Sequence, residues 1–150
     1  MLNPDYKDIL SAFSDEKVEF LLVGAFALAA HGLPRATGDI DLWIRRTSLN
    51  AKRVIRALQV FGAPLADVSE KDFLTPGLVF QIGVAPRRID ILTSIDGVDF
   101  DEAWPEREEV AVGGIRIPLI SRKHLIRNKR AVGRPQDEAD ARRLEDRSEE

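Results

Sequence analysis

The sequence contains no cysteine and only two histidines, His31 and His124. Without cysteine, the chain cannot form a disulfide, a thiolate zinc site or a cysteine nucleophile. Two histidines in 150 residues also argue against a metal site built on imidazole ligands. Functions that depend on a thiolate are therefore excluded.

Long apolar runs are absent as well. The longest, residues 20–30, is too short to span a bilayer and is interrupted by Gly24. The first residues lack the basic and then apolar order of a signal peptide, so we expect a cytoplasmic protein. The net charge of −3 provides no general attraction to nucleic acid or membrane, and any such binding would have to be local.

The composition that is present, 44% hydrophobic and 31% charged residues, is typical of a soluble globular protein. Apolar periodicity, caps and turn signals predict helices at 4–16, 25–30, about 50–61, 121–132 and 136–147. They predict strands at 18–23, 39–44, 78–84, 88–95, 107–112 and 115–119. This order predicts an α/β (α+β) fold, with a mixed β-sheet flanked by helices and a C-terminal helical segment. We expect one domain over residues 1–150, with a core at about 17–95, a hairpin at 107–119 and C-terminal helices at 121–147.

The stretch from residue 20 to residue 43 organises the rest of the chain. A buried strand ends at Gly24, a short helix follows, and a second strand alternates acidic and apolar residues from Asp39. Alternation along a strand places Asp39 and Asp41 on one face, with their Cα atoms roughly 7 Å apart. Two carboxylates at this spacing can bind one hard cation together.

Gly24 predicts a phosphate site beside these acids. Without a Cβ atom, its backbone can approach a ligand closely, and the helix that begins there directs free N–H groups and a positive dipole outward. A strand, a glycine, a helix start and an Asp-x-Asp strand would together hold a magnesium–nucleoside triphosphate.

This stretch resembles the signature of the nucleotidyltransferase fold superfamily, the polymerase β-like enzymes. The sequence motif from His31 to Asp41, His-Gly-x-Pro-Arg-x-Thr-x-Asp-Ile-Asp, is most similar to that of the AbiEii-type and related small bacterial nucleotidyltransferases. Members of the family usually carry Gly-Gly or Gly-Ser where this chain has Gly24-Ala25. Alanine keeps the backbone N–H but removes any hydroxyl contact to phosphate.

The resemblance implies an enzyme that transfers an NMP unit from an NTP to a hydroxyl acceptor and releases pyrophosphate. It implies that Asp39 and Asp41 bridge two Mg²⁺ ions. The AbiEii-type likeness further implies an RNA acceptor such as tRNA, and a toxin-like role with a separately encoded antitoxin protein.

Asp90 is a third candidate carboxylate, within the apolar run Arg88–Leu92. A charge in an apolar strand is costly unless it is paired or bound to a metal. The alternative is an edge-strand residue that discourages aggregation. The resemblance implies that Asp90 binds the second metal ion and helps to deprotonate the acceptor hydroxyl.

Four further residues near the Asp-x-Asp strand are candidates for ligand binding or for packing. Arg35 and Thr37 lie in the preceding loop, where Arg35 could hold a phosphate in bidentate fashion or clamp a nearby acid. His31 is expected as a capping or packed histidine. Trp43 shares the face of the two acids and could stack on a base, but packing is the favoured interpretation.

The segment 122–134 contains six Lys or Arg residues and no acid. Together with the residues that follow, it resembles the C-terminal motif of these enzymes, in which a lysine and a following aspartate close over the nucleotide phosphates. This likeness gives that role to Lys129 and Asp137. The alternative is a solvated basic helix face, and Asp140 is expected to be exposed or paired.

Two other functions fit the same residues. One is a small-molecule nucleotidyltransferase of the antibiotic-modifying type. The other is a catalytically inactive member that binds nucleotide or a protein partner.

Overall fold

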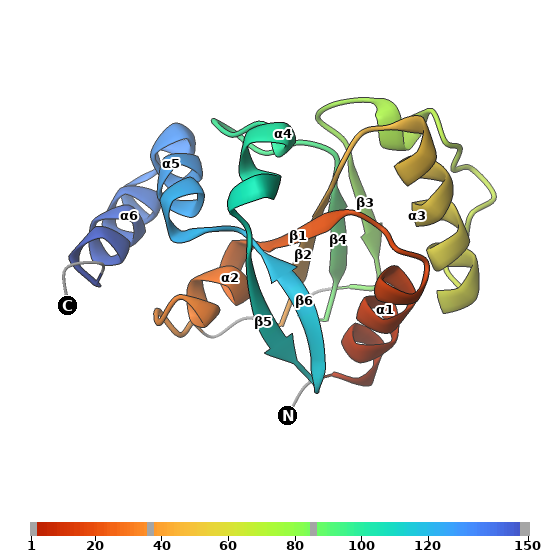
Figure 1. The fold of residues 1–150 in the computed structure, drawn as a ribbon, viewed down its shortest axis with the longest axis horizontal. Coiled ribbons are helices and arrows are strands. Elements are labelled where there is room, and N and C mark those ends of the chain that lie inside the picture. The colour runs from red at the N-terminus through yellow and green to blue at the C-terminus, as the bar shows by residue number, and fades with distance from the viewer. Residues whose placement is uncertain (1–2, 36–37, 85–86, 148–150) are drawn as a thin grey trace.

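The computed structural model describes residues 3–35, 38–84 and 87–147. In this part of the chain six strands form one mixed sheet in the order β3-β4-β2-β1-β6-β5 (Figure 1). The strands are β1 (Phe20–Val23), β2 (Ile40–Ile44), β3 (Val79–Ile82), β4 (Ile89–Leu92), β5 (Glu108–Val112) and β6 (Ile115–Leu119). The helices are α1 (Pro4–Asp15), α2 (Gly24–Ala30), α3 (Ser48–Phe61), α4 (Phe100–Ala103), α5 (Arg122–Val132) and α6 (Pro135–Arg147), with 3₁₀ turns at Asp72–Leu74 and Trp104–Glu106. The predicted mixed α/β fold is confirmed.

The centre of the sheet brings together strands that are far apart in the sequence. β1 pairs antiparallel with β2, and β2 pairs parallel with β4 in a register that sets Asp41 opposite Asp90. The β5–β6 hairpin joins the same sheet because β6 pairs parallel with β1. Since β4 lies between β3 and β2, the reading of Asp90 as an edge-strand residue is wrong.

The two faces of the sheet are covered by different helices. α1 and α3 pack together on one face, and α2 and α4 lie on the face that carries the acids (Figure 1). On the acid face, Trp43 is 1% exposed and its ring meets that of Phe100 edge-on, with centroids 5.0 Å apart. Trp43 is therefore a core residue, as the favoured interpretation holds.

Local signals explain where the main helices begin and end. The side chains of Asn3 and Ser121 accept hydrogen bonds from backbone N–H groups in the first turns of α1 and α5. Thr47 caps α3, and its side chain accepts from the backbone N–H of Asn50. Gly62 ends α3 in the left-handed conformation, with φ of 94°.

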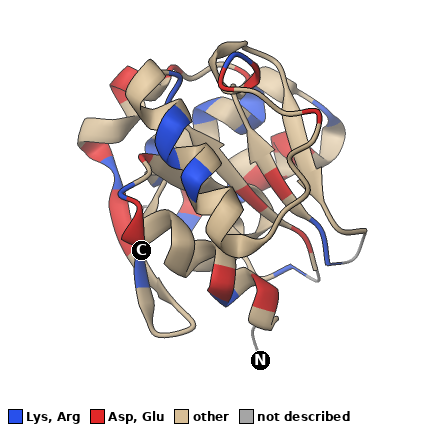
Figure 2. Cartoon of the chain, turned by 90° about the vertical axis from the view of Figure 1, so that its right-hand side faces the viewer, with Lys and Arg blue, Asp and Glu red and all other residues tan. Residues whose placement is uncertain are grey.

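The outer side of α3 is basic, as Figure 2 shows. Lys52 and Arg56 on this side are exposed to solvent. Among the described residues, no helix has the length and apolar character needed to cross a membrane.

Candidate active site at the strands β2 and β4

Two carboxyl groups meet at the centre of the site. Asp41 of β2 is partly buried, and Asp90, opposite it on β4, is 6% exposed. Burial raises the pKa of Asp41 to about 7, and the negative charge of Asp90, a hydrogen bond with Asp90 and the charge of Asp39 add to the effect. The site therefore holds more negative charge than its surroundings compensate.

Gly24 lies directly against Asp41. Residue 24 has a φ of 70°, and a Cβ atom added to it would lie 2.9 Å from Cγ of Asp41 and nearer still to one carboxylate oxygen. β1 ends beside Asp41 because Val23 and Asp41 are paired in the sheet, and α2 begins at the next residue. The carboxylate thus lies beside the first turn of α2, which also contains Ala25.

Arg88 connects the other two acids. Its Nε lies 2.7 Å from one oxygen of Asp90 and its Nη2 lies 3.1 Å from the other, which makes a bidentate pair. Its Nη2 is 3.4 Å from Asp39, and its backbone N–H donates to Asp39 over 2.9 Å. Two of the predicted acids, Asp39 and Asp90, are therefore brought together by one guanidinium group, and Asp41 is paired with Asp90 across the two strands.

Arg88 is a residue of this site that the sequence patterns did not predict. A signal was present, because Arg88 precedes Asp90 by two residues and side chains at this spacing share one face of a strand. Tyr6 of α1 also reaches this site. Its hydroxyl donates to the carbonyl of Arg88 over 3.4 Å, and burial, followed by the charge of Asp39, raises its pKa.

The donor set suits a hard divalent cation, since it consists of three carboxylates with an excess of negative charge. As the side chains stand, no group of three acidic or histidine residues in the described ranges is arranged to hold a metal ion. Arg88 instead binds two of the three carboxylates. The three carboxylates are suitable ligands for a divalent cation. In this structure the cation that Asp39 and Asp90 contact is the guanidinium group of Arg88.

A second charged cluster ties the C-terminal helices to the loop before β2. Arg35 makes a bidentate pair with Asp140, which is fully buried and lies 105 residues away in the sequence. The ammonium group of Lys129 lies 3.4 Å from Asp137 and 3.6 Å from Asp140. Arg134 binds Asp137 over 2.6 Å.

Hydrogen bonds from arginine keep both buried acids ionised. The bond from Arg134 is the main cause of the lowered pKa of Asp137, and the bond from Arg35 is the main cause of the lowered pKa of Asp140. In this structure Arg35 therefore binds a nearby acid, which is one of the two roles predicted for it. Asp140 was predicted to be exposed or paired, and it is paired. In the described part of the chain, neither Arg35 nor Lys129 forms an ion pair with Asp41 or Asp90. Thr37 lies outside the described residues.

The other basic residues of α5 are compensated by acids of neighbouring segments. Arg127 pairs with Glu102 over 2.6 Å, and Arg130 pairs with Glu138 over 3.0 Å. These pairs support the reading of a solvated helix face for the residues other than Lys129. His31 is packed: it is 7% exposed, and its Nε2 lies 2.8 Å from a backbone carbonyl oxygen of the β6 end.

No protein-family model and no curated protein sequence matches the chain. Among solved structures, the chain is similar to a crystal structure of a Thermotoga maritima protein whose assignment as a nucleotidyltransferase is itself provisional. The two chains share 18% sequence identity, the match covers 98% of this chain and 96% of that one, and the TM-score is 0.59. This likeness shows that the chain shares the fold of that protein.

Proposed function

We propose that this protein is a magnesium-dependent nucleotidyltransferase that moves an NMP unit from an NTP to a hydroxyl acceptor. One observation carries the proposal: the carboxyl groups of Asp41 and Asp90 meet on paired strands, directly beside Gly24 at the start of α2. This is the relation between a phosphate-binding turn and an acidic metal site that such a reaction requires. The similar fold of the Thermotoga maritima protein supports it.

In this proposal Asp39, Asp41 and Asp90 hold magnesium. The ion, when bound, supplies the charge that neutralises the triphosphate and lowers the pKa of the acceptor hydroxyl. Asp90, on the interior strand, would bind the second ion and help to deprotonate that hydroxyl. Asp41 lies directly beside Gly24, where only a residue without a side chain leaves room for the carboxylate.

The phosphates would be bound by the backbone of Gly24 and Ala25 and by the second cluster. Arg35 and Lys129 each have at least one buried acid partner, and each could exchange part of that contact for a phosphate oxygen. Asp137 would keep the ammonium of Lys129 directed to the nucleotide. Thr37 is included on the resemblance of its loop alone.

The acceptor and the biological role rest on the AbiEii-type resemblance. On that basis the acceptor is an RNA such as tRNA, and the activity is a toxic one that an antitoxin protein neutralises. A small-molecule acceptor is the alternative. The two differ in what becomes labelled, so one assay separates them.

The test is incubation of the protein with each α-labelled NTP, Mg²⁺ and total RNA, followed by identification of the labelled product. We expect label in RNA, none when Mg²⁺ is chelated, and none with Asp41→Asn. Label in a small molecule from a cell extract would identify the alternative acceptor. Absence of transfer with every NTP and both acceptor classes would reject the enzyme.

A second candidate, an inactive member that binds nucleotide, is favoured by one observation. Arg88 already neutralises Asp39 and Asp90 without a metal ion. A protein of this kind would bind NTP in the same assay conditions and transfer no label.

A further inference from the structure

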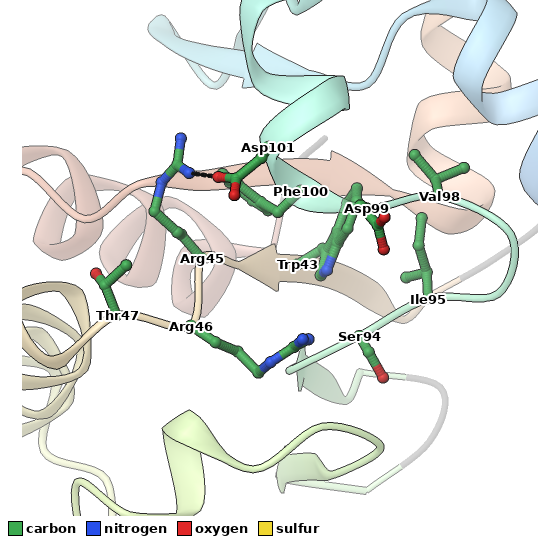
Figure 3. A pocket seen from close by; sticks show the side chains of 10 residues that line it. All are labelled: Trp43, Arg45, Arg46, Thr47, Ser94, Ile95, Val98, Asp99, Phe100 and Asp101. Carbon is green, nitrogen blue, oxygen red and sulfur yellow. Dashed lines mark hydrogen bonds and ion pairs between the residues drawn. The ribbon is translucent and has the colours of Figure 1, made fainter.

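A pocket of about 300 Å³ lies where β2 and β4 end (Figure 3). Its lining comes from the end of β2 and the loop after it, from the segment after β4, and from the start of α4. The volume lies at the lower end of the range for small-molecule sites. Because β2 and β4 are parallel, their carboxyl ends meet at one edge of the sheet, where open α/β sheets commonly bind ligands.

The indole of Trp43 supplies a hydrogen-bond donor with no partner. The side chain is 1% exposed, and its Nε1 atom is buried without a hydrogen bond in the described part of the structure. A buried N–H without a partner costs about 1–3 kcal/mol. In Figure 3 this nitrogen lies on the side of the indole that faces Arg46, so an oxygen atom between the two residues would satisfy it.

Arg46 supplies a positive charge without an acidic partner. Its Nη1 donates to the carbonyl of Thr93 over 2.6 Å, which holds the guanidinium group at the pocket, and no described carboxylate lies within ion-pair distance of it. Its neighbour Arg45 differs, because it pairs with Glu19 over 3.3 Å and with Asp101. Arg46 is therefore available for an anionic ligand.

Two hydroxyl groups of the pocket can also donate. Ser94 Oγ accepts a hydrogen bond from the backbone N–H of Gly77 over 2.8 Å, and Thr47 Oγ1 accepts one from Asn50 over 3.2 Å. Each oxygen is used as an acceptor, which leaves its hydrogen free for a ligand.

Two acids also line the pocket. Asp101 is neutralised by Arg45, and Asp99 lies exposed at the start of α4, where its backbone N–H donates to the carboxylate of Glu102 over 3.1 Å. The donors of Trp43, Ser94 and Thr47 and the guanidinium group of Arg46 together match a phosphate or a carboxylate group, which would lie on their side of the pocket, away from Asp99.

The pocket lies on the same face of the sheet as the acid cluster. Trp43 follows Asp41 by two residues on β2, which places their Cα atoms about 7 Å apart. We propose that this pocket binds an anionic group, a phosphate or a carboxylate, of the acceptor substrate, whose hydroxyl then reaches Asp41 and Asp90. The assignment to the acceptor rests on the proposed function, whereas the anion site itself does not.

Inorganic phosphate is the probe for a direct test. The protein has two tryptophans, and Trp104→Phe identifies which indole N–H resonance in a ¹H–¹⁵N spectrum belongs to Trp43. Titration with phosphate, against chloride at equal ionic strength, should shift the Trp43 resonance to saturation. Arg46→Gln should weaken the apparent affinity at least tenfold. Arg53→Gln, which removes the same charge from α3 outside the pocket, should leave it unchanged.

A Trp43 resonance that does not respond, or an equal affinity in Arg46→Gln, would overturn the anion site. A competition experiment distinguishes the source of the anion. A short oligoribonucleotide and a small phosphomonoester are each titrated against bound phosphate, and the natural source resembles the compound that displaces phosphate at the lower concentration. Asp41→Asn should keep phosphate binding in this pocket. Binding with no nucleotide transfer in the wild type would reject the proposed function and keep the site. Normal transfer with an unchanged acceptor KM in Arg46→Gln would reject the acceptor role and keep the enzyme.

Discussion

The carboxylate of Asp41 occupies the space that a side chain on residue 24 would need. An added Cβ atom at Gly24 would lie 2.9 Å from Cγ of Asp41, and the backbone there has a φ of 70°, which disfavours any other residue. The glycine that ends β1 and the second acid of the Asp-x-Asp strand are thus one structural unit. The pairing of Val23 with Asp41 in the sheet holds the turn and the strand together, and the missing side chain at residue 24 leaves room for the carboxylate.

Gly24→Ala should therefore lower the free energy of unfolding by about 3 kcal/mol or more, because steric overlap adds to backbone strain. Gly62→Ala is the matched control. Residue 62 also has a positive φ, 94°, but nothing lies within 4 Å of an added Cβ atom. Its cost should be backbone strain alone, about 1 kcal/mol. Urea denaturation of both variants decides, and equal losses would show that the contact with Asp41 is unimportant.

Asp41→Asn should change the pH dependence of stability. The pKa of Asp41 is about 7 in the folded protein, above the value of about 3.9 for an unfolded chain, so between these values the folded state binds more protons. The contribution of this group to wild-type stability is therefore fully present below about pH 4, falls as the pH rises to 7, and is constant above. Without metal, the variant should lack this fall and be more stable than the wild type by about 1–3 kcal/mol at pH 8. Urea denaturation at pH 4, 6 and 8 measures the free energy of unfolding of both proteins. Asp8→Asn, which changes an exposed carboxylate, is the control.

The same variant should transfer nucleotide about a hundredfold more slowly than the wild type. A neutral amide binds a hard cation less tightly than a carboxylate, and the lost stabilisation of the transition state is on the order of 3 kcal/mol. Single-turnover transfer of labelled NMP is the measurement. An unchanged rate would remove Asp41 from the metal site, and an unfolded variant would make this acid structural.

Arg88→Gln should raise the affinity for Mn²⁺ about tenfold, because the variant removes a guanidinium group that competes for Asp39 and Asp90. The variant should also be less stable without metal, since it leaves Asp90 buried and without its cation. Electron paramagnetic resonance of free Mn²⁺ gives the affinity. Arg116→Gln, which breaks an exposed pair with Glu109, is the control. Equal Mn²⁺ affinities in all three proteins would mean that Arg88 does not compete with the ion.

Asp140→Asn should cost about 3 kcal/mol of stability, since the carboxylate is fully buried and binds Arg35 in bidentate fashion. Glu138→Gln, which breaks an exposed pair with Arg130, should cost less than about 1 kcal/mol. Thermal melting compares the two. A loss no greater in Asp140→Asn would show that the cluster does not hold the C-terminal helices to the loop before β2.

Lys129→Ala should weaken NTP binding tenfold or more, and Arg127→Ala should weaken it less than twofold. Lys129 is 13% exposed within the second cluster, whereas Arg127 is paired with Glu102 at the surface. Binding is measured by calorimetry at a temperature where both variants are folded. Small and equal effects would assign Lys129 a structural role.

Much of the fold could be read locally. The cap at Ser121, the glycine stops at Gly24 and Gly62 and the hairpin at residues 113–114 each depend on a few adjacent residues, so local chemistry was enough. The strands were predicted too long at residues 78–84 and 88–95, because apolar composition continues beyond the paired residues. Pairing, which ends them, is not visible in composition.

The candidate site divides in the same way. The alternation of Asp39 and Asp41, and the single charge of Asp90 in an apolar run, were sufficient to select the three acids. Their meeting depends on β2 and β4 pairing in parallel over a separation of 49 residues between Asp41 and Asp90, which only tertiary structure decides.

The sequence by itself determined the element order, the fold class and the candidate acids, since periodicity, turn chemistry and charge within an apolar strand act over a few residues. Only the tertiary structure decided that Arg88 faces two of those acids, that Arg35 binds Asp140, and that Trp43 and Arg46 line one pocket, in which the indole N–H of Trp43 has no partner. These relations depend on how strands and helices far apart in the chain approach one another. A charged side chain can pair with many different groups, and only the packing of the folded chain decides which of them lies within reach. No local sequence pattern predicts that partner.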